Sequence, residues 1–320
     1  MNLNDLKVHL SIINSEDQPV GIRIHVAIKN EDGNESIAVA DVSDDLASDL
    51  KEMFRRTINQ RFFNDEEFVL TNISDANELI NSAFYYDIDE FPEKLMILQE
   101  FDTWHDYPEF SFSNDAIESI KAILITIGNQ NNYFTVFKHV YPVTILRQDK
   151  VLGFVPIGNR FEKLTSSILQ INNSIDFIFT ENKLIINNLR TLTTSYGYQE
   201  VIKNQAKEKV ELIRSLDLIV NIDVLTAFIE NIKYAKRVLK INIESPVLQL
   251  AKDSIVNFIK NHEKLSLKIR FEENGERILL DTDVSKILTI GILNDDFLRS
   301  HLTDLDYESE RKAEFLIEAN

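Results

Sequence analysis

Basic side chains recur at helical spacing in the C-terminal half of the chain, where they could hold the phosphate groups of a nucleic acid. A helix predicted over Asp223–Lys240 carries Lys233, Lys236, Arg237 and Lys240 on the face opposite its apolar residues. Each cation on such a face can contact one phosphate and add a salt-dependent, sequence-independent contribution to affinity. This set predicts a DNA-binding surface, with a merely solvated helix face as the alternative.

Two neighbouring helical patterns carry further cations of the same kind. Lys203 and Lys207 are i, i+4 neighbours on a helix predicted over 199–216, and Lys260 and Lys264 follow in a later helical pattern. Aromatic residues are sparse among these cations, so contacts to a duplex backbone fit better than base stacking on single strands. The alternative is that these faces dock onto the acidic N-terminal third of the chain or onto a protein partner.

An acidic pair and a lysine on a predicted β-hairpin offer a second kind of chemistry. Asp176, Glu181 and Lys183 stand as D-x4-E-x-K, a pattern with which some nucleases hold Mg²⁺ and position water. A Mg²⁺-dependent nuclease is therefore the enzymatic alternative, although a simple polar turn explains Glu181 and Lys183 equally. The glycine motifs of nucleotide-binding loops are absent, and the six histidines show no metal-ligand spacing. We therefore predict no catalytic residue, no metal and no cofactor.

The net charge of −18 is distributed in blocks along the chain. Residues 1–118 contain 8 basic and 26 acidic residues, residues 119–270 contain 21 and 13, and residues 271–320 contain 5 and 13. Whole-chain acidity argues against a polyanion partner, whereas a basic middle segment permits one. One hypothesis is that the acidic N-terminal block mimics or excludes nucleic acid, so that only the middle of the chain touches it.

Composition indicates a folded protein of about two domains. The chain has 320 residues, of which 44% are hydrophobic, enough to bury a core. It contains no cysteine, which excludes disulfides, thiolate metal sites and cysteine nucleophiles and fits a reducing compartment. Residues 1–10 lack the order of a signal peptide, and no run approaches the ~20 apolar residues of a membrane span. The sequence predicts a soluble, cytoplasmic protein that only a partner would bring to a membrane.

The expected fold class is α+β, with antiparallel strand clusters, a segregated helical region and two domains. In an acidic N-terminal domain over residues 1–118, alternating apolar residues predict a hairpin of strands at 6–12 and 22–28. A third strand is expected near 36–40, after an Asp-Gly turn. Ser43 is then expected to cap an amphipathic helix.

A strand-and-helix domain is predicted over residues 119–320. Its central strand at 120–127 is apolar on both faces, a second strand follows at 133–140, and strands at 174–180 and 183–187 form a hairpin. The later elements expected are helices over 199–216 and 223–240, a helix starting at Ser245 and Pro246, and a hairpin of strands at 267–271 and 277–280. The basic residues fall on these helices, which makes this the predicted DNA-binding domain.

Two stretches of the chain form a recognisable pattern. The first consists of apolar strand segments at residues 117–127, 133–138, 174–179 and 184–188. The second is the run LNDDFLRSHLT over residues 293–303, followed by Tyr307. Across roughly residues 80–315 this pattern resembles the KwaB family, the B components of Kiwa anti-phage defence systems.

The resemblance implies a homodimer or higher homo-oligomer that binds double-stranded DNA and has no enzymatic activity. It further implies a cytoplasmic effector that is recruited to the inner membrane by a small membrane protein, KwaA. Together the two components would hinder phage DNA replication and late expression. The family pattern carries no DNA-contacting motif that transfers residue by residue, so the basic residues above rest on their spacing alone.

Overall fold

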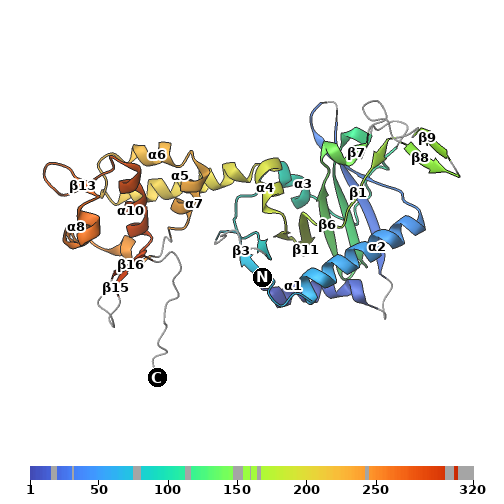
Figure 1. The fold of residues 1–320 in the computed structure, drawn as a ribbon, viewed down its shortest axis with the longest axis horizontal. Helices are drawn as coiled ribbons and strands as arrows, with labels where there is room; N and C mark the ends of the chain where they lie inside the picture. Colours follow the sequence, from blue (N-terminus) through green and yellow to red (C-terminus); the bar gives the residue numbers. More distant parts are fainter. Residues whose placement is uncertain are drawn as a thin grey trace, which may run out of the picture. The chain divides into compact units, whose positions relative to one another are not determined.

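The computed structural model divides the chain into two compact units, Met1–Gly197 and Tyr198–Asn320. The structure describes residues 1–15, 20–30, 32–74, 81–111, 117–146, 154–158, 160–163, 167–241, 245–299 and 306–308. Figure 1 shows a sheet at the centre of the first unit and a group of helices in the second. The fold class is therefore α+β, as predicted.

An eight-stranded sheet organises the first unit, in the order β2–β1–β5–β6–β11–β12–β4–β3. Neighbouring strands are antiparallel except β3 and β4, which are parallel. The strands are β1 Gly21–Lys29, β2 Glu35–Val39, β3 Val69–Asn72, β4 Ser82–Tyr85, β5 Ile120–Gly128, β6 Tyr133–His139, β11 Phe177–Thr180 and β12 Lys183–Ile186. The strands predicted in this part of the chain are confirmed, except the one at residues 6–12.

The pairing of β1 with β5 moves the domain boundary. Strands on both sides of residue 118 belong to this single sheet, so the boundary expected between residues 118 and 119 falls inside the first unit. The change of charge near residue 119 is real in the sequence, but charge acts on the surface, whereas the sheet is held together by its buried apolar strands. The first unit ends at Gly197 instead.

Residues 6–12 form a helix instead of the predicted strand. Helix α1 spans Leu3–Leu10 and continues as the 3₁₀ turn η1, Ser11–Asn14. The Asn2 side chain accepts the Asp5 N–H while the Asp5 carboxylate accepts the Asn2 N–H, which fixes the first turn. An alternating apolar run also contains i, i+4 pairs, and here the pair Leu6 and Leu10 is fully buried. The capping box and this burial together favour the helix.

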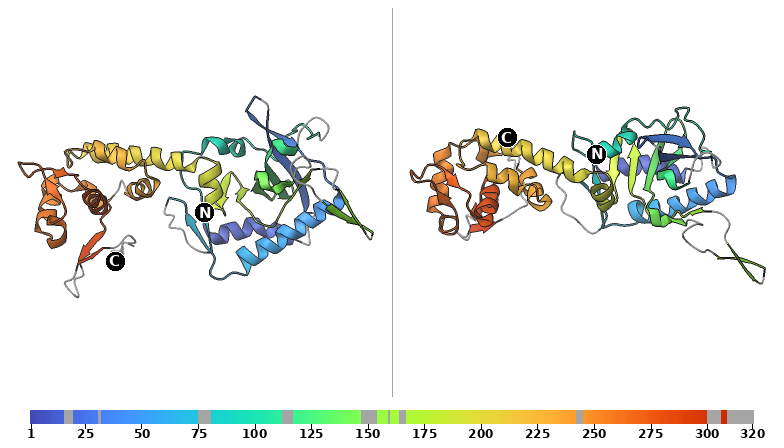
Figure 2. Two further views of the ribbon diagram at one scale, coloured as in Figure 1. Left: turned by 45° about the horizontal axis from the view of Figure 1, so that its top comes forward. Right: turned by 90° about the horizontal axis from the view of Figure 1, so that it is seen from above.

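Helices α1 and α2 lie on one face of the sheet, as Figures 1 and 2 show. Helix α2 spans Asp44–Ile58 and continues as a π-helical turn, η2, Asn59–Phe63. It begins at Ser43, whose hydroxyl accepts the N–H of Leu46 as predicted. The shared core of α1, α2 and this face of the sheet includes Leu6, Leu10, Ile24, Leu50, Phe54, Ile58, Ile125, Val136, Ile178 and Ile185.

The opposite face of the sheet is covered by residues 92–107 and by helix α4, Leu189–Ser195. On this face the rings of Phe137 and Phe177 stack at 5.2 Å, and Tyr196 packs edge-on against both. The shorter elements of the first unit are η3 Glu93–Leu95, α3 Met96–Gln99, η4 Ile117–Ser119, η5 Pro142–Thr144, β7 Ile145–Leu146, β8 Phe154–Ile157, β9 Arg160–Lys163 and β10 Ile168–Leu169.

The second unit consists mainly of helices. Its elements are α5 Tyr198–Ser215, α6 Asp223–Phe228, α7 Ile232–Leu239, η6 Pro246–Gln249, α8 Lys252–Asn261, α9 Glu263–Ser266, β13 Arg270–Phe271, β14 Ile278–Leu279, α10 Asp283–Leu293, β15 Phe297–Arg299 and β16 Asp306–Glu308. Helix α5 is as predicted, and β13 pairs with β14 in the predicted hairpin. Across the described ranges, the structure contains no helix with the length and apolarity needed to span a bilayer.

Two helix predictions in the second unit are wrong in detail. The helix expected over 223–240 is interrupted between Phe228 and Ile232, because the Asn231 side chain accepts the Lys233 N–H and starts a new helix there. The segment that starts at Pro246 is only a 3₁₀ turn, and α8 begins six residues later.

Candidate nucleic-acid interface

Four of the predicted DNA-binding residues share one face of helix α7. At 3.6 residues per turn, Lys233, Lys236, Arg237 and Lys240 fall within an arc of about 100°. The buried residues of this helix, Ala235 and Val238, lie on the opposite side, and α7 packs against α5. The sequence therefore folds so that the apolar side of α7 is in the core and the basic side is at the surface.

We call this surface the α7 basic face and define it as Lys233, Lys236, Arg237 and Lys240. Its four cations differ in exposure. Lys233 is exposed, whereas the other three are half-buried, as long basic side chains are when their stems cover apolar surface. The Lys233 Nζ lies 6.0 Å from the centre of the Tyr234 ring. Within the described residues, neither Lys233 nor Lys236 has a carboxylate at ion-pair distance.

Tyr234, the one aromatic residue among these cations, is already stacked. Its ring lies 3.7 Å from that of Phe228 with an angle of 15° between the planes. The Lys286 Nζ lies 5.0 Å from the centre of the Phe228 ring. This intramolecular stack occupies one face of the Tyr234 ring, on which a nucleic-acid base would otherwise stack. Helix α7 is therefore better suited to contact phosphates by charge than to stack on bases.

The lysines of α5 are held by carboxylates of the second unit itself. The Glu230 carboxylate lies 3.3 Å from the Lys203 Nζ and 3.5 Å from the Lys207 Nζ, and Glu200 lies 3.5 Å from Lys203. The hydrogen bond to Glu230 raises the pKa of Lys203, and the same contact lowers the pKa of Glu230. These two lysines link α5 to the segment between α6 and α7, and the structure does not place them as open cations.

Lys260 and Lys264 lie on different helices from the α7 basic face. Lys260, at the end of α8, donates from Nζ to the Gly275 carbonyl at 2.6 Å and lies 5.0 Å from the Phe271 ring. This contact ties α8 to the turn of the β13–β14 hairpin, where Gly275 has a φ of 72°. Lys264 is exposed on α9. The eight predicted residues thus divide into one compact set on α7 and two sets with other surroundings.

The residues of the nuclease alternative do not converge. The carboxylate of Asp176 accepts hydrogen bonds from the His139 N–H, the Asn188 amide and the Thr191 hydroxyl. Strand β11 separates it from Glu181, about 16 Å of extended chain away. Glu181 forms the hairpin turn and lies 3.8 Å from Lys183. Over the ranges that the structure describes, no group of three histidine or acidic side chains could hold a metal ion.

Asp176, which is 3% exposed, is instead the centre of a largely buried polar cluster that the sequence did not reveal. We define this polar cluster as Lys138, His139, Tyr141, Asp176, Thr191 and Tyr196. Tyr196 hydrogen-bonds His139 Nδ1 at 2.8 Å, and Tyr141 hydrogen-bonds Thr191 at 2.7 Å. Burial lowers the pKa of His139 and raises that of Tyr196. The cluster anchors α4 and the end of the first unit to the sheet.

A buried lysine completes this cluster. Lys138 is 6% exposed, and its Nζ donates to the side chains of Asn172 and Ser174 and to the Ser174 carbonyl. Burial lowers the pKa of Lys138, and the nearby Asp176 opposes that shift. In sequence Lys138 appeared as one polar residue of an alternating strand, so no local signal distinguished it from a solvated lysine.

Comparison with known proteins adds an independent observation. A family model described as Kiwa protein KwaB-like matches residues 117–303, which is more than half of the chain and includes every residue of the α7 basic face. A relative named Kiwa protein KwaB, from Escherichia coli O55:H7 (strain RM12579 / EPEC), is 26% identical over 267 residues. The alignment covers 82% of this chain and 85% of that protein. No solved structure matches the chain. The chain belongs to the Kiwa protein KwaB-like family.

Proposed function

We propose that this protein is the B component of a Kiwa anti-phage defence system and that it binds double-stranded DNA through the α7 basic face without cleaving it. Family membership supports the defence role. The observation that carries the DNA-binding part is the placement of four cations within about 100° of one helix, opposite its buried side. No catalytic group enters the proposal, because the residues of the nuclease alternative are far apart.

The dimensions of α7 suit a phosphate backbone. Eight residues of helix extend about 12 Å, and a duplex carries one negative charge per ~1.7 Å of its axis. The basic face can therefore contact three or four phosphates, each contact releasing counterions. Such contacts position the protein on DNA but do not read its sequence. We expect binding that is similar for unrelated sequences and strongly dependent on salt.

The acidity of the molecule shapes this binding. The first unit contains 16 basic and 30 acidic residues, and the second contains 18 and 22. Neither unit attracts DNA by its total charge, so a local cationic face must do so. In the proposal the strongly acidic first unit repels the duplex, which restricts contact to the second unit.

The remaining parts of the proposal follow from the Kiwa system. We expect the protein to act in the cytoplasm as a homodimer or higher homo-oligomer and to be recruited to the inner membrane by the membrane protein KwaA. Several copies in one assembly would multiply weak phosphate contacts, since linked sites bind far more tightly than single ones. Bound in this way along phage DNA, the assembly would obstruct replication and late expression.

The proposal is tested by neutralising the α7 basic face. In the test variant all four residues become glutamine, which preserves most of each apolar stem. We expect its affinity for a labelled duplex, measured by fluorescence anisotropy, to fall about tenfold or more, equally for two duplexes of unrelated sequence. Unchanged affinity would contradict the assignment of this face. Incubation of DNA with the protein and Mg²⁺ should leave the DNA intact.

A matched control removes the same amount of charge from the first unit. It replaces four lysines with glutamine: Lys29, Lys94, Lys121 and Lys163. Because these residues lie outside the second unit, we expect DNA affinity to change much less than in the α7 variant. An equal loss in both variants would indicate that total charge, not a localised face, governs binding.

A further inference from the structure

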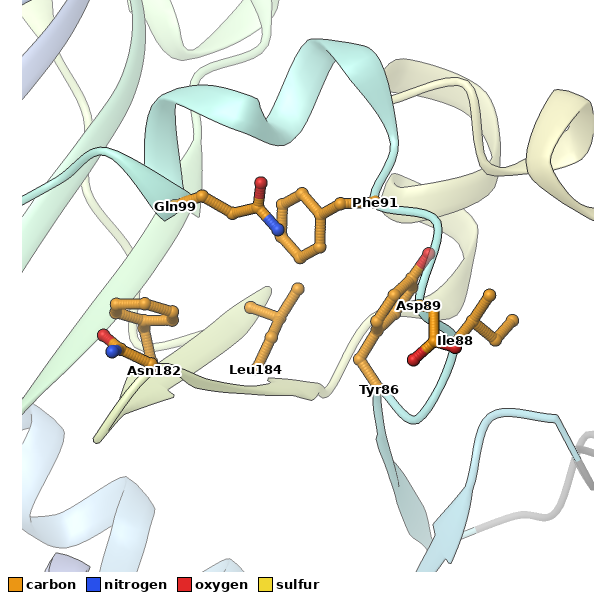
Figure 3. Close-up of a pocket in the computed structure, with 8 residues that line it drawn as sticks. Tyr86, Ile88, Asp89, Phe91, Gln99, Asn182 and Leu184 are labelled. Carbon is orange, nitrogen blue, oxygen red and sulfur yellow. The ribbon is translucent and has the colours of Figure 1, made fainter.

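A pocket of about 330 Å³ lies in the first unit, far along the chain from the basic helices. It lies on the sheet face opposite α1 and α2, between the β11–β12 hairpin and the segment that links β4 to α3. Its lining residues are Tyr86, Ile88, Asp89, Phe91, Gln99, Phe179, Asn182 and Leu184. In Figure 3, Gln99 and Phe91 lie on one side of the pocket and Asn182 and Leu184 on the other, with Tyr86 and Asp89 at a third side.

The walls of this pocket are fixed by backbone pairing. Phe179 and Leu184 are partners across the β11–β12 hairpin, so their side chains share one face of the sheet. The Tyr86 N–H donates to the Leu184 carbonyl at 2.9 Å, and its hydroxyl donates to the Glu90 carbonyl at 2.6 Å. The rings of Tyr86 and Phe91 meet edge to face at 5.4 Å. Three aromatic rings thus line the pocket, those of Tyr86, Phe91 and Phe179, and the first two pack against each other. The faces of aromatic rings attract cations.

The polar groups of the pocket are the Asp89 carboxylate, which can only accept hydrogen bonds when ionised, and the Gln99 and Asn182 amides, which can accept or donate them. Asp89, Gln99 and Asn182 are exposed, so a group from outside can reach them. Asp89 is the one charged residue of the lining, and no lysine, arginine or histidine belongs to it. An anionic ligand would meet this carboxylate without a compensating cation, whereas a cationic ligand would be attracted. Glu90 follows directly in the chain and adds to the negative field.

We propose that this pocket binds the guanidinium group of an arginine side chain from a protein partner. A guanidinium is planar, so it stacks on aromatic rings, and its fork of N–H groups matches the Asp89 carboxylate in a bidentate pair. The exposed amides of Gln99 and Asn182, which lie on other sides of the pocket, can accept hydrogen bonds from the peptide backbone that carries the arginine. A lysine ammonium offers only a hydrated point charge and lacks this planar match. The inference goes beyond the proposed DNA binding and involves the other unit.

The inference is tested by saturation-transfer difference NMR on the full-length protein. The probes are a Gly-Gly-Arg-Gly-Gly peptide, N-acetyl-arginine amide, agmatine and N-acetyl-citrulline amide, the last being a neutral isostere of the second. For probes of this size we expect dissociation constants on the order of 1 mM for the peptide and for N-acetyl-arginine amide. N-acetyl-citrulline amide should bind at least about tenfold more weakly. Equal binding of citrulline amide, absence of saturation, or binding of agmatine with exclusion of the peptide would each overturn the proposal.

Substitutions locate the binding at the pocket. Asp89→Asn keeps the shape of the side chain and should weaken binding of the peptide about tenfold or more. Glu93→Gln changes the charge equally on an exposed neighbour outside the lining and should leave binding unchanged. Asn182→Gly removes an amide but suits the left-handed backbone at this position, where φ is 60°, and should weaken binding severalfold. Equal effects of Asp89→Asn and Glu93→Gln would overturn the pocket as the site.

Discussion

The two units of this protein use charged side chains in opposite ways. The first unit buries Lys138 and Asp176 within a hydrogen-bonded cluster on its sheet, although its surface is strongly acidic. In the second unit, ion pairs lie at the surface, for example those of Glu230 with Lys203 and Lys207. Burial gives Lys138 and Asp176 a structural role in the first unit, whereas the α7 basic face of the second unit lies at the surface.

This difference shows that a dense run of lysines does not by itself locate a binding surface. Lys203 and Lys207 have the same i, i+4 spacing as Lys233 and Arg237. The first pair meets Glu230 after folding, and that carboxylate comes from a different helical segment. Only the fold separates cations that link helices, as Lys203 and Lys207 do, from an exposed cation such as Lys233.

The largest effect is expected from breaking the buried polar cluster. Asp176→Ala removes the acceptor of three hydrogen bonds and leaves Lys138 without its nearby carboxylate, which should lower the free energy of unfolding by about 3–5 kcal/mol. Urea unfolding followed by fluorescence of Trp104 measures this change, because the single tryptophan lies in the first unit.

Asp106→Ala is the matched control for that substitution. It removes an exposed carboxylate of the same unit and should change stability by no more than about 0.5 kcal/mol. A small loss in Asp176→Ala, comparable with this control, would mean that the cluster does not stabilise the first unit and would break the comparison between the two units.

A smaller loss of unfolding free energy is expected when the pH is lowered, because of His25. This residue is 0% exposed, and within the described residues neither ring nitrogen has a hydrogen-bond partner. Burial, with a contribution from Arg23, lowers the pKa of His25 to about 4. The unfolded chain then binds a proton more readily than the folded one between pH 6.5 and 4. Stability from this group is complete above pH 6.5 and falls by roughly 2 kcal/mol between pH 7 and pH 5.

His25→Phe isolates that contribution. The ring keeps its edge-on contacts with Phe101 and Tyr107 but cannot take up a proton. We expect the difference in unfolding free energy between the variant and the unchanged protein to grow in favour of the variant as pH falls from 7 to 5. A difference that is constant with pH would show that His25 does not titrate on unfolding.

The smallest effect is expected in the second unit. Glu230→Gln removes the ion pairs of Lys203 and Lys207. The Glu230 carboxylate is exposed to solvent, which screens these pairs, so the melting temperature should fall by less than about 2 °C. The helical circular dichroism signal follows this transition. A loss of unfolding free energy in Glu230→Gln as large as that in Asp176→Ala would show that surface ion pairs stabilise the second unit as strongly as buried polar contacts stabilise the first.

Much of the fold was predictable because its strongest patterns are local. The apolar strands β5 and β6, the β11–β12 hairpin and the Ser43 cap each carry their own signal within a few residues. Helix α1 was not predicted, because the apolar residues at 6–12 satisfy two periodicities and the capping box at Asn2 favours the helix.

The site was predictable only in part. Spacing alone predicted that the four residues of the α7 basic face share one side of a helix, because their arrangement depends on that helix alone. The pairing of Lys203 with Glu230 and the cluster around Asp176 depend on contacts between segments distant in sequence, which a single sequence does not display. The aromatic pocket was not predicted for the same reason, because its lining residues come from both the β4–α3 segment and the β11–β12 hairpin.

The salt dependence of DNA affinity tests the central claim most directly. Association constants for one duplex are measured over a range of salt concentrations for the unchanged protein and for the variant with glutamine at all four positions of the α7 basic face. Because each lost phosphate contact removes about 0.9 from the slope of log K against log salt, we expect the slope of the variant to be shallower by about 3 to 4. Identical slopes for the two proteins would contradict the account.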